Sequence, residues 1–280
     1  MLSDKRIKHT FGELSGFIKT LYKFTQILLD ELAEQTLSHT YKDKRKQDYL
    51  IQSIARSRVQ IKSVFLLFEL KHYSDMNILM RNMAEKLLIL YDLVDNNNFT
   101  EFYNFSIVSN FEIRNKIKSD ANVKQNLNTK FWSETKERQK SYELIKCFKT
   151  KWVRPNSSRL EVIAKKHDLL EIYKYCYKTC SGFVHPTYSD GAEEFVDFIA
   201  GLEKVDDFES RISYLNNSTL MFILTLEIVV NELEGKKHPL IFSFINSSFD
   251  FIRDKKTIYK ECFSQIEEIK FKEMGKFISL

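Results

Sequence analysis

Two short segments of the chain, about 100 residues apart, hold side chains that can bind an anion and move a proton. In the first, Arg81 and Glu85 stand four residues apart, so they share one face of a helix and form an ion pair worth about 0.3 kcal/mol. Because Arg81 is flanked by Met80 and Met83, a second interpretation is a half-buried Arg that faces a specific anionic partner.

The second segment is the run Ser-Gly-Phe-Val-His-Pro at residues 181–186. Ser181 and Gly182 let another backbone approach closely, and Pro186 ends the helix that precedes it. His185 is then expected at the C-terminal end of that helix, where the helix dipole favours the imidazolium. Such a histidine titrates near neutral pH. The alternative is a histidine that only caps the helix.

Other familiar catalytic signatures are absent from the sequence. It has no phosphate-binding Gly-rich loop, no His-Glu-x-x-His and no Gly-x-Ser-x-Gly motif. Cys176 and Cys180 share a helical face and could join His167 or His185 in a metal site, but their spacing does not suit a zinc knuckle. We therefore expect buried free thiols, no metal and no cofactor.

Positive charge is concentrated in residues 114–166, which hold 15 basic and 5 acidic residues in a chain of net charge +5. Aromatic residues are interleaved with the lysines, a combination that suits single-stranded nucleic acid. The alternative is a solvated Lys-rich helix with both tryptophans in the core. The candidate nucleic-acid contacts are Lys146, Lys149, Lys151, Trp152, Arg154 and Arg159.

The composition favours an all-α protein, because 7 Gly and 3 Pro in 280 residues leave little turn chemistry for a sheet. Apolar residues recur at steps of three and four, which predicts helices packed as an antiparallel bundle with additional C-terminal helices. The expected helices begin near residues 11, 48, 75, 99, 131, 158, 169 and 218, with one or two more after residue 240.

We expect residues 1–190 to form the bundle, with the basic segment 114–166 as an insertion and residues 191–280 as a helical elaboration packed on it. A domain boundary, if one exists, is expected after Asp120 or near Gly191. Four cysteines, no signal peptide and an apolar stretch of only residues 220–230 indicate a cytoplasmic protein outside the membrane.

The Arg81 and Glu85 pair, combined with the Ser-x-x-x-His-Pro run that begins at Ser181, resembles an uncharacterised bacterial all-helical family that is similar to the HEPN superfamily. The resemblance covers roughly residues 48–188. Many HEPN domains are dimeric, metal-independent ribonucleases of toxin–antitoxin, abortive-infection and other antiviral defence systems. The resemblance therefore implies a HEPN-like bundle that forms a homodimer, binds RNA and cleaves it, with a protein partner from such a system.

In active members of that superfamily, an Arg followed four to six residues later by a His carries the chemistry; here Lys178 stands seven residues before His185. The resemblance implies that His185 is the general base on the ribose 2′-hydroxyl or the general acid on the leaving 5′-oxygen. Lys178 and Arg81 would neutralise the phosphate. Glu85 and Ser181 complete the expected catalytic set.

Two other functions are compatible with the same residues. One is a non-catalytic helical module, the sensor or scaffold of a defence or toxin complex, in which His185 has a structural role. The other is a pocket for a nucleotide or phosphate ligand formed by Arg81, Lys178 and His185. An exposed cleft between His185 and Arg81 favours cleavage, whereas a buried His185 bonded to the backbone favours the scaffold.

Overall fold

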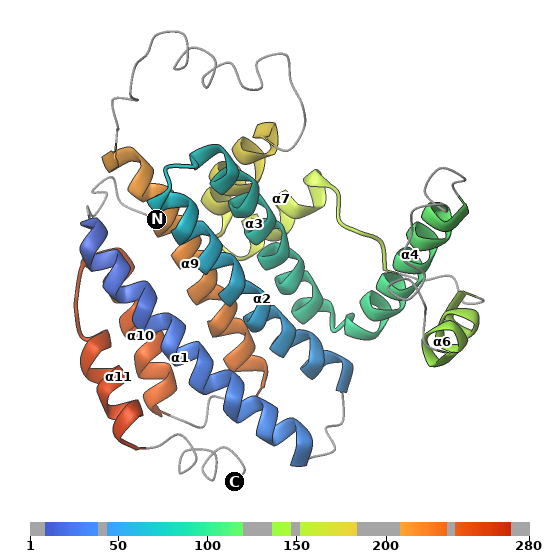
Figure 1. The fold of residues 1–280 in the computed structure, drawn as a ribbon, viewed down its shortest axis with the longest axis horizontal. Coiled ribbons are helices and arrows are strands. Elements are labelled where there is room, and N and C mark those ends of the chain that lie inside the picture. Colours follow the sequence, from blue (N-terminus) through green and yellow to red (C-terminus); the bar gives the residue numbers. More distant parts are fainter. Residues whose placement is uncertain are drawn as a thin grey trace. The chain divides into compact units, whose positions relative to one another are not determined.

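The computed structural model describes residues 9–38, 44–119, 136–146, 152–183, 208–233 and 239–269 (Figure 1). Every regular element among these residues is helical, which confirms the prediction of an all-α protein. The chain divides into two compact units, one formed by Met1–Tyr91 with Ser157–Leu280 and the other by Asp92–Asn156. The expected boundaries after Asp120 and near Gly191 lie outside the described residues.

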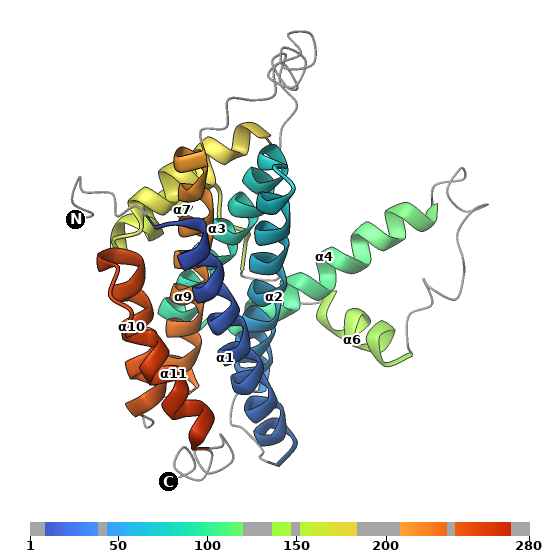
Figure 2. The same ribbon diagram turned by 60° about the vertical axis from the view of Figure 1, so that its left-hand side comes forward.

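The first unit is a set of long helices that lie side by side (Figure 2). Its α2 packs along α9, α1 packs against both of them, and α10 packs against α9 and α11. The C-terminal helices therefore belong to the same compact unit as the N-terminal ones. The bounds are α1 Phe11–Ser38, α2 Lys44–Glu69, α9 Phe208–Glu232, α10 Pro239–Asp254 and α11 Tyr259–Glu268. Helix α3, Tyr73–Asn96, belongs to this unit up to Tyr91.

The core of this unit is built from the apolar stripes that the periodicity predicts. In α1 the stripe runs from Leu14 to Leu32, and both ends of it are buried. Thr25 interrupts the stripe and is fully buried, but its hydroxyl donates to the carbonyl groups of Leu21 and Tyr22, at 3.1 and 2.9 Å. The buried polar atom therefore has partners and does not break the seam.

Aromatic side chains fill the space between α1 and the C-terminal helices. The ring of Phe17 lies 4.5 Å from that of Phe251 and 4.7 Å from that of Tyr259, centroid to centroid. Phe24 packs on Phe244 in the same way, at 4.3 Å. These pairs explain how a chain rich in Phe builds its core, since each buried ring removes a large apolar area from water.

Several helices end without glycine. Lys71, Asp168 and Lys255 adopt positive φ angles of 60°, 56° and 56°. After the first two, the next amide closes the helix by bonding five residues back: His72 N–H donates to the Leu67 carbonyl at 2.9 Å, and that of Leu169 to Ala164 at 2.8 Å. This pattern is a Schellman motif. It shows how a chain with so few glycines still ends its helices.

Helix α9 is longer than the apolar stretch that the sequence suggests. Its segment Ile212–Glu232 is long and apolar enough to cross a membrane by length and composition, but 67% of an 18-residue apolar stretch within it is buried inside the protein. The helix packs against α2, α10 and α1. Such burial is typical of a core helix.

The second unit contains α4 Phe99–Ser119 and α6 Lys136–Lys146, which pack against each other. The rings of Phe111 and Tyr142 join the two helices, stacked with centroids 4.3 Å apart and planes at 4°. Trp152 lies in the segment that follows, with its ring 4.8 Å from those of Phe102 and Phe105. An aromatic cluster therefore holds this unit together.

Candidate functional site

The segment that carries Lys178 and Ser181 is a wide helix that tightens at its end. After α7, Ser157–Lys166, a short turn leads to η1, Ile172–Lys178, a π-helix, and then to η2, Thr179–Phe183, a 3₁₀-helix. The sequence predicts a helix that begins near residue 169, and a helix is present there, but the sequence does not predict its π and 3₁₀ hydrogen bonding. The Thr179 N–H donates to the carbonyl of Lys174, five residues back, which is the hydrogen bond of a π-helix.

Two side chains of η2 take up the carbonyl oxygens that the wide turns expose. The Thr179 hydroxyl donates to the Lys174 carbonyl at 2.9 Å, and the Cys180 thiol to the Tyr175 carbonyl at 3.3 Å. A π-helix is rare and is frequently found at functional sites. This one places Tyr173 and Tyr177 on the buried side of the helix, with their rings stacked at 5.5 Å.

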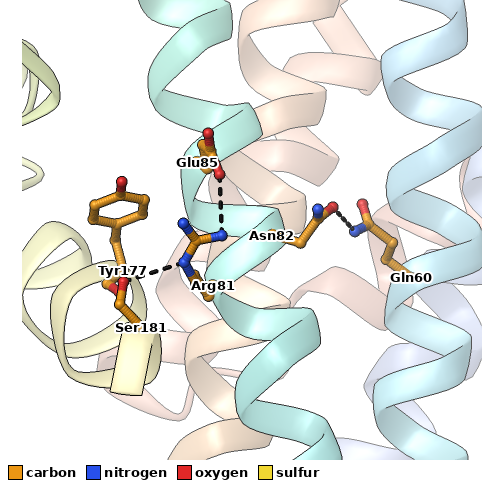
Figure 3. Close-up of polar contacts among 6 residues, drawn as sticks. All are labelled: Gln60, Arg81, Asn82, Glu85, Tyr177 and Ser181. Carbon is orange, nitrogen blue, oxygen red and sulfur yellow. Dashed lines mark hydrogen bonds and ion pairs between the residues drawn. The ribbon is translucent and has the colours of Figure 1, made fainter. Parts of the chain in front are cut away.

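The two predicted motifs meet at Arg81 (Figure 3). The Nε of Arg81 in α3 donates to the Oγ of Ser181 in η2 at 3.1 Å, across 100 residues of sequence. The Ser181 hydroxyl in turn donates to the Tyr177 carbonyl at 2.6 Å. Because Ser181 accepts from one side and donates to the other, its orientation is fixed and it connects α3 to the π-helix.

Glu85 and Tyr177 complete the surroundings of the guanidinium group. Nη1 of Arg81 lies 3.3 Å from Oε2 of Glu85, and the two side chains are 17% and 7% exposed. The guanidinium carbon lies 5.1 Å from the centroid of the Tyr177 ring, within the range of a cation–π contact. Arg81 is therefore both paired with Glu85 and largely buried. We call Arg81, Glu85, Tyr177 and Ser181 the Arg81 junction.

The Arg81 junction retains the capacity to bind an anion. A guanidinium group has five N–H donors. Within the part of the chain that the structure describes, Nε bonds Ser181 and Nη1 bonds Glu85, and Nη2 makes no hydrogen bond. These remaining donors have the planar arrangement that matches two oxygens of a phosphate.

Other predicted site residues have different positions. Lys178 lies on the exposed face of η1, whereas its neighbour Tyr177 faces Arg81. His185 lies outside the described residues. The structure thus brings together Arg81, Glu85 and Ser181 from the predicted catalytic set.

The cysteines of this segment are buried thiols. Burial raises the pKa of Cys176 to about 12 and that of Cys180 to about 11, so both are protonated at neutral pH. The Cys180 thiol donates to the Asn77 side chain at 3.4 Å, while the ring of His167 packs at a tilt against that of Tyr91, with centroids 4.3 Å apart. Among the described residues, no group of three His, Cys, Asp or Glu side chains is placed to hold a metal ion.

One of the predicted nucleic-acid contacts is corrected by the structure. Trp152 is only 4% exposed, and its ring packs against Phe102 and Phe105, so it cannot stack on a base. It is a core residue of the second unit, which was the alternative interpretation. Arg154 and Arg159 are exposed. Lys146 ends α6, whereas Lys149 and Lys151 lie outside the described residues.

Sequence reasoning missed how α3 is held to α2. Asn82, next to Arg81, accepts a hydrogen bond from Nε2 of Gln60 at 2.8 Å (Figure 3). Gln60 is 2% exposed whereas Asn82 is exposed, so this part-buried bond joins α2 to α3 where their contact meets the surface. The signal in the sequence was a Gln directly beside Ile61, a residue of the apolar stripe of α2, where a buried amide needs a polar partner.

Comparison with known proteins adds one finding. No curated protein and no solved structure matches the chain. A family model described as "Family of unknown function (DUF5677)" matches residues 47–198, more than half of the chain. That match includes Arg81, Glu85, Ser181 and His185. The chain therefore belongs to the DUF5677 family.

Proposed function

We propose that this protein is a HEPN-like RNA-binding protein and a metal-independent endoribonuclease of a bacterial toxin or antiviral defence system, which acts as a cytoplasmic homodimer. The observation that carries the proposal is the hydrogen bond between Arg81 and Ser181, 100 residues apart in sequence. It joins the Arg and Glu motif to the segment in which His185 follows four residues later. A phosphate-binding cation and a neutral-pH acid or base are the two groups that such a reaction needs.

The reaction is an internal phosphoryl transfer within RNA. His185 removes the proton from a ribose 2′-hydroxyl, and the 2′-oxygen forms a bond to the adjacent phosphorus. The bond from phosphorus to the 5′-oxygen breaks, and that oxygen receives a proton from the same residue of the second copy. The products are a 2′,3′-cyclic phosphate and a 5′-hydroxyl. Arg81 stabilises the extra negative charge on the phosphate oxygens, whereas Lys178 lies on the exposed face of η1 and is left to bind the RNA strand.

The position of His185 in the sequence supports this assignment. His185 follows Ser181, the residue that bonds Arg81, by four residues. Arg81 also keeps donors for that phosphate while Glu85 and Ser181 hold it in place. The fixed orientation of the guanidinium matters, because prearranged donors stabilise a transition state better than mobile ones.

The test is cleavage of mixed RNAs by purified protein in the presence of a chelator, with wild type beside His185→Ala. We expect cleavage that resists the chelator in the wild type and is lost in the variant. Urea denaturation of both proteins gives the control for folding. If neither protein cleaves any RNA while both are equally stable, the proposal is wrong.

One observation favours a second candidate, a non-catalytic interaction or sensor module. The charge of Arg81 is already balanced by a nearly buried Glu85, and its Nε is used to hold η2 against α3. In this second candidate, the role of Arg81 is structural: it joins α3 to η2 and binds no substrate. In that case Arg81→Lys destabilises the chain, and the protein binds its partner without cleaving RNA.

A further inference from the structure

The solvent face of η1 carries a large aromatic side chain that packing does not explain. The helix buries Ile172, Tyr173, Cys176 and Tyr177. On the opposite side, Tyr175 is 60% exposed, between the exposed residues Lys174 and Lys178. A π-helix turns once in about 4.4 residues, so Lys174 and Lys178 lie one above the other with Tyr175 beside them.

A third lysine faces the same area from α7, which packs on η1. The ammonium group of Lys165 lies 2.7 Å from Oε1 of Glu161. This hydrogen bond lowers the pKa of Glu161, and the charges of Lys178 and Lys174 lower it further. Lys165 therefore contacts the Glu161 carboxylate, and the charges of Lys174 and Lys178 act on it through space. We call Lys165, Lys174, Tyr175 and Lys178 the Tyr175 face.

Two of these lysines are available to a ligand. In the described part of the chain, the ammonium groups of Lys174 and Lys178 make no hydrogen bond and no close ion pair, whereas Lys165 is engaged with Glu161. The Tyr175 hydroxyl also makes no hydrogen bond there, and its ring is open to solvent. The face thus offers two free cations beside one free aromatic ring.

We propose that the Tyr175 face binds single-stranded RNA, with a base stacked on Tyr175 and the flanking phosphates on Lys174 and Lys178. Stacking on an exposed ring requires an unpaired base, and a duplex hides the faces of its bases inside the helix. This inference rests on the proposed function and names its substrate class.

The fold connects this face to the Arg81 junction. Tyr177, two residues after Tyr175, lies against the Arg81 guanidinium. The Ser181 hydroxyl accepts a hydrogen bond from Arg81 and donates one to the Tyr177 carbonyl. The same π-helix therefore presents Tyr175 outward and Tyr177 inward. A strand that stacks on Tyr175 and passes Lys178 approaches the end of the helix that leads to Ser181.

The test is fluorescence anisotropy with a labelled single-stranded RNA and its matched duplex. All proteins are the full chain carrying His185→Ala, so that bound RNA stays intact. We expect Tyr175→Ala to weaken single-strand binding by roughly 5- to 150-fold, the range for loss of one stacked base. Tyr175→Phe retains the ring and is expected to bind within about twofold of the parent.

A second pair of variants tests the charge. Lys174→Gln is expected to weaken binding and to lower the salt slope by about 1, as for the loss of one phosphate contact. Lys256→Gln, which removes an exposed lysine between α10 and α11, is the matched control and leaves both unchanged.

Tighter binding of the duplex, or equal affinities for Tyr175→Ala and its parent, would overturn this inference. Such a result leaves the proposed function standing if His185 still governs cleavage in the otherwise wild-type protein. If the parent binds no RNA and the wild type cleaves none, both are wrong. The two failures are therefore distinguishable.

Discussion

The Arg81–Glu85 ion pair should be a much stronger contact than its spacing in the sequence suggests. At a separation of 3.3 Å, two unit charges attract by about 5 kcal/mol at an effective dielectric constant near 20. Loss of hydration offsets much of this attraction, because the side chains are only 17% and 7% exposed. We expect a net coupling of about 1 to 3 kcal/mol in a double-mutant cycle.

The chain contains a matched control for this cycle. Glu161 and Lys165 in α7 are also four residues apart, with a shorter separation of 2.7 Å and side chains that are 37% and 58% exposed. On an isolated helix the order Glu then Lys is the better one, so surface rules alone rank the α7 pair first. Burial reverses that ranking, because solvent screens the exposed pair.

The assay is urea denaturation of the full chain for the single and double Ala variants of each pair. The free energy of unfolding of each variant gives the coupling between the two side chains. We expect Glu85→Ala alone to cost about 3 kcal/mol, since it leaves a largely buried guanidinium without its carboxylate. Equal couplings for the two pairs would refute the reasoning from burial.

Three further predictions concern single residues. Lys255→Gly should raise the free energy of unfolding by about 0.5 kcal/mol in urea denaturation, because Lys255 adopts a φ of 56° that costs a non-Gly residue energy; Lys256→Gly should give no such gain. Cys176 should resist iodoacetamide at pH 8 until the chain is unfolded, as mass spectrometry of the native protein can check, because burial raises the pKa of its thiol to about 12. Burial also raises the pKa of Glu227 in the folded state, so its protonated form favours folding below its ordinary pKa of 4.5 and this contribution is lost as the pH rises through the raised value. Glu227→Gln should therefore be more stable than wild type at pH 7. It should also lose less stability than wild type as the pH rises from 4.5 through the raised pKa of Glu227, measured by thermal denaturation in a pH series.

The helices could be predicted from the sequence because their packing depends on local periodicity. The stripe from Leu14 to Leu32 follows steps of three and four, and burial follows it. The π-helix could not be predicted in this way. Over the two turns from Tyr173 to Cys180, a period of 4.4 residues and one of 3.6 place nearly the same residues inside.

In the candidate site, too, the contact within one helix could be predicted from the sequence and the contact between helices could not. Arg81 and Glu85 are four residues apart, so their pairing follows from the geometry of one helix. The contact of Arg81 with Ser181 depends on how α3 packs against η2, which no local pattern encodes. Trp152 was misjudged as a nucleic-acid contact because aromatic residues among lysines suit either a binding surface or a core, and only burial separates the two.

The single-turnover rate of RNA cleavage by Arg81→Lys in chelator tests most directly whether the Arg81 junction carries the reaction. The variant keeps the positive charge but loses the planar fork and the Nε donor to Ser181. Misplacing one such donor is expected to lower the rate about 100-fold or more, with single-stranded RNA still bound through the Tyr175 face. A rate equal to that of the wild type would contradict the claim that the Arg81 junction is the functional centre of this protein.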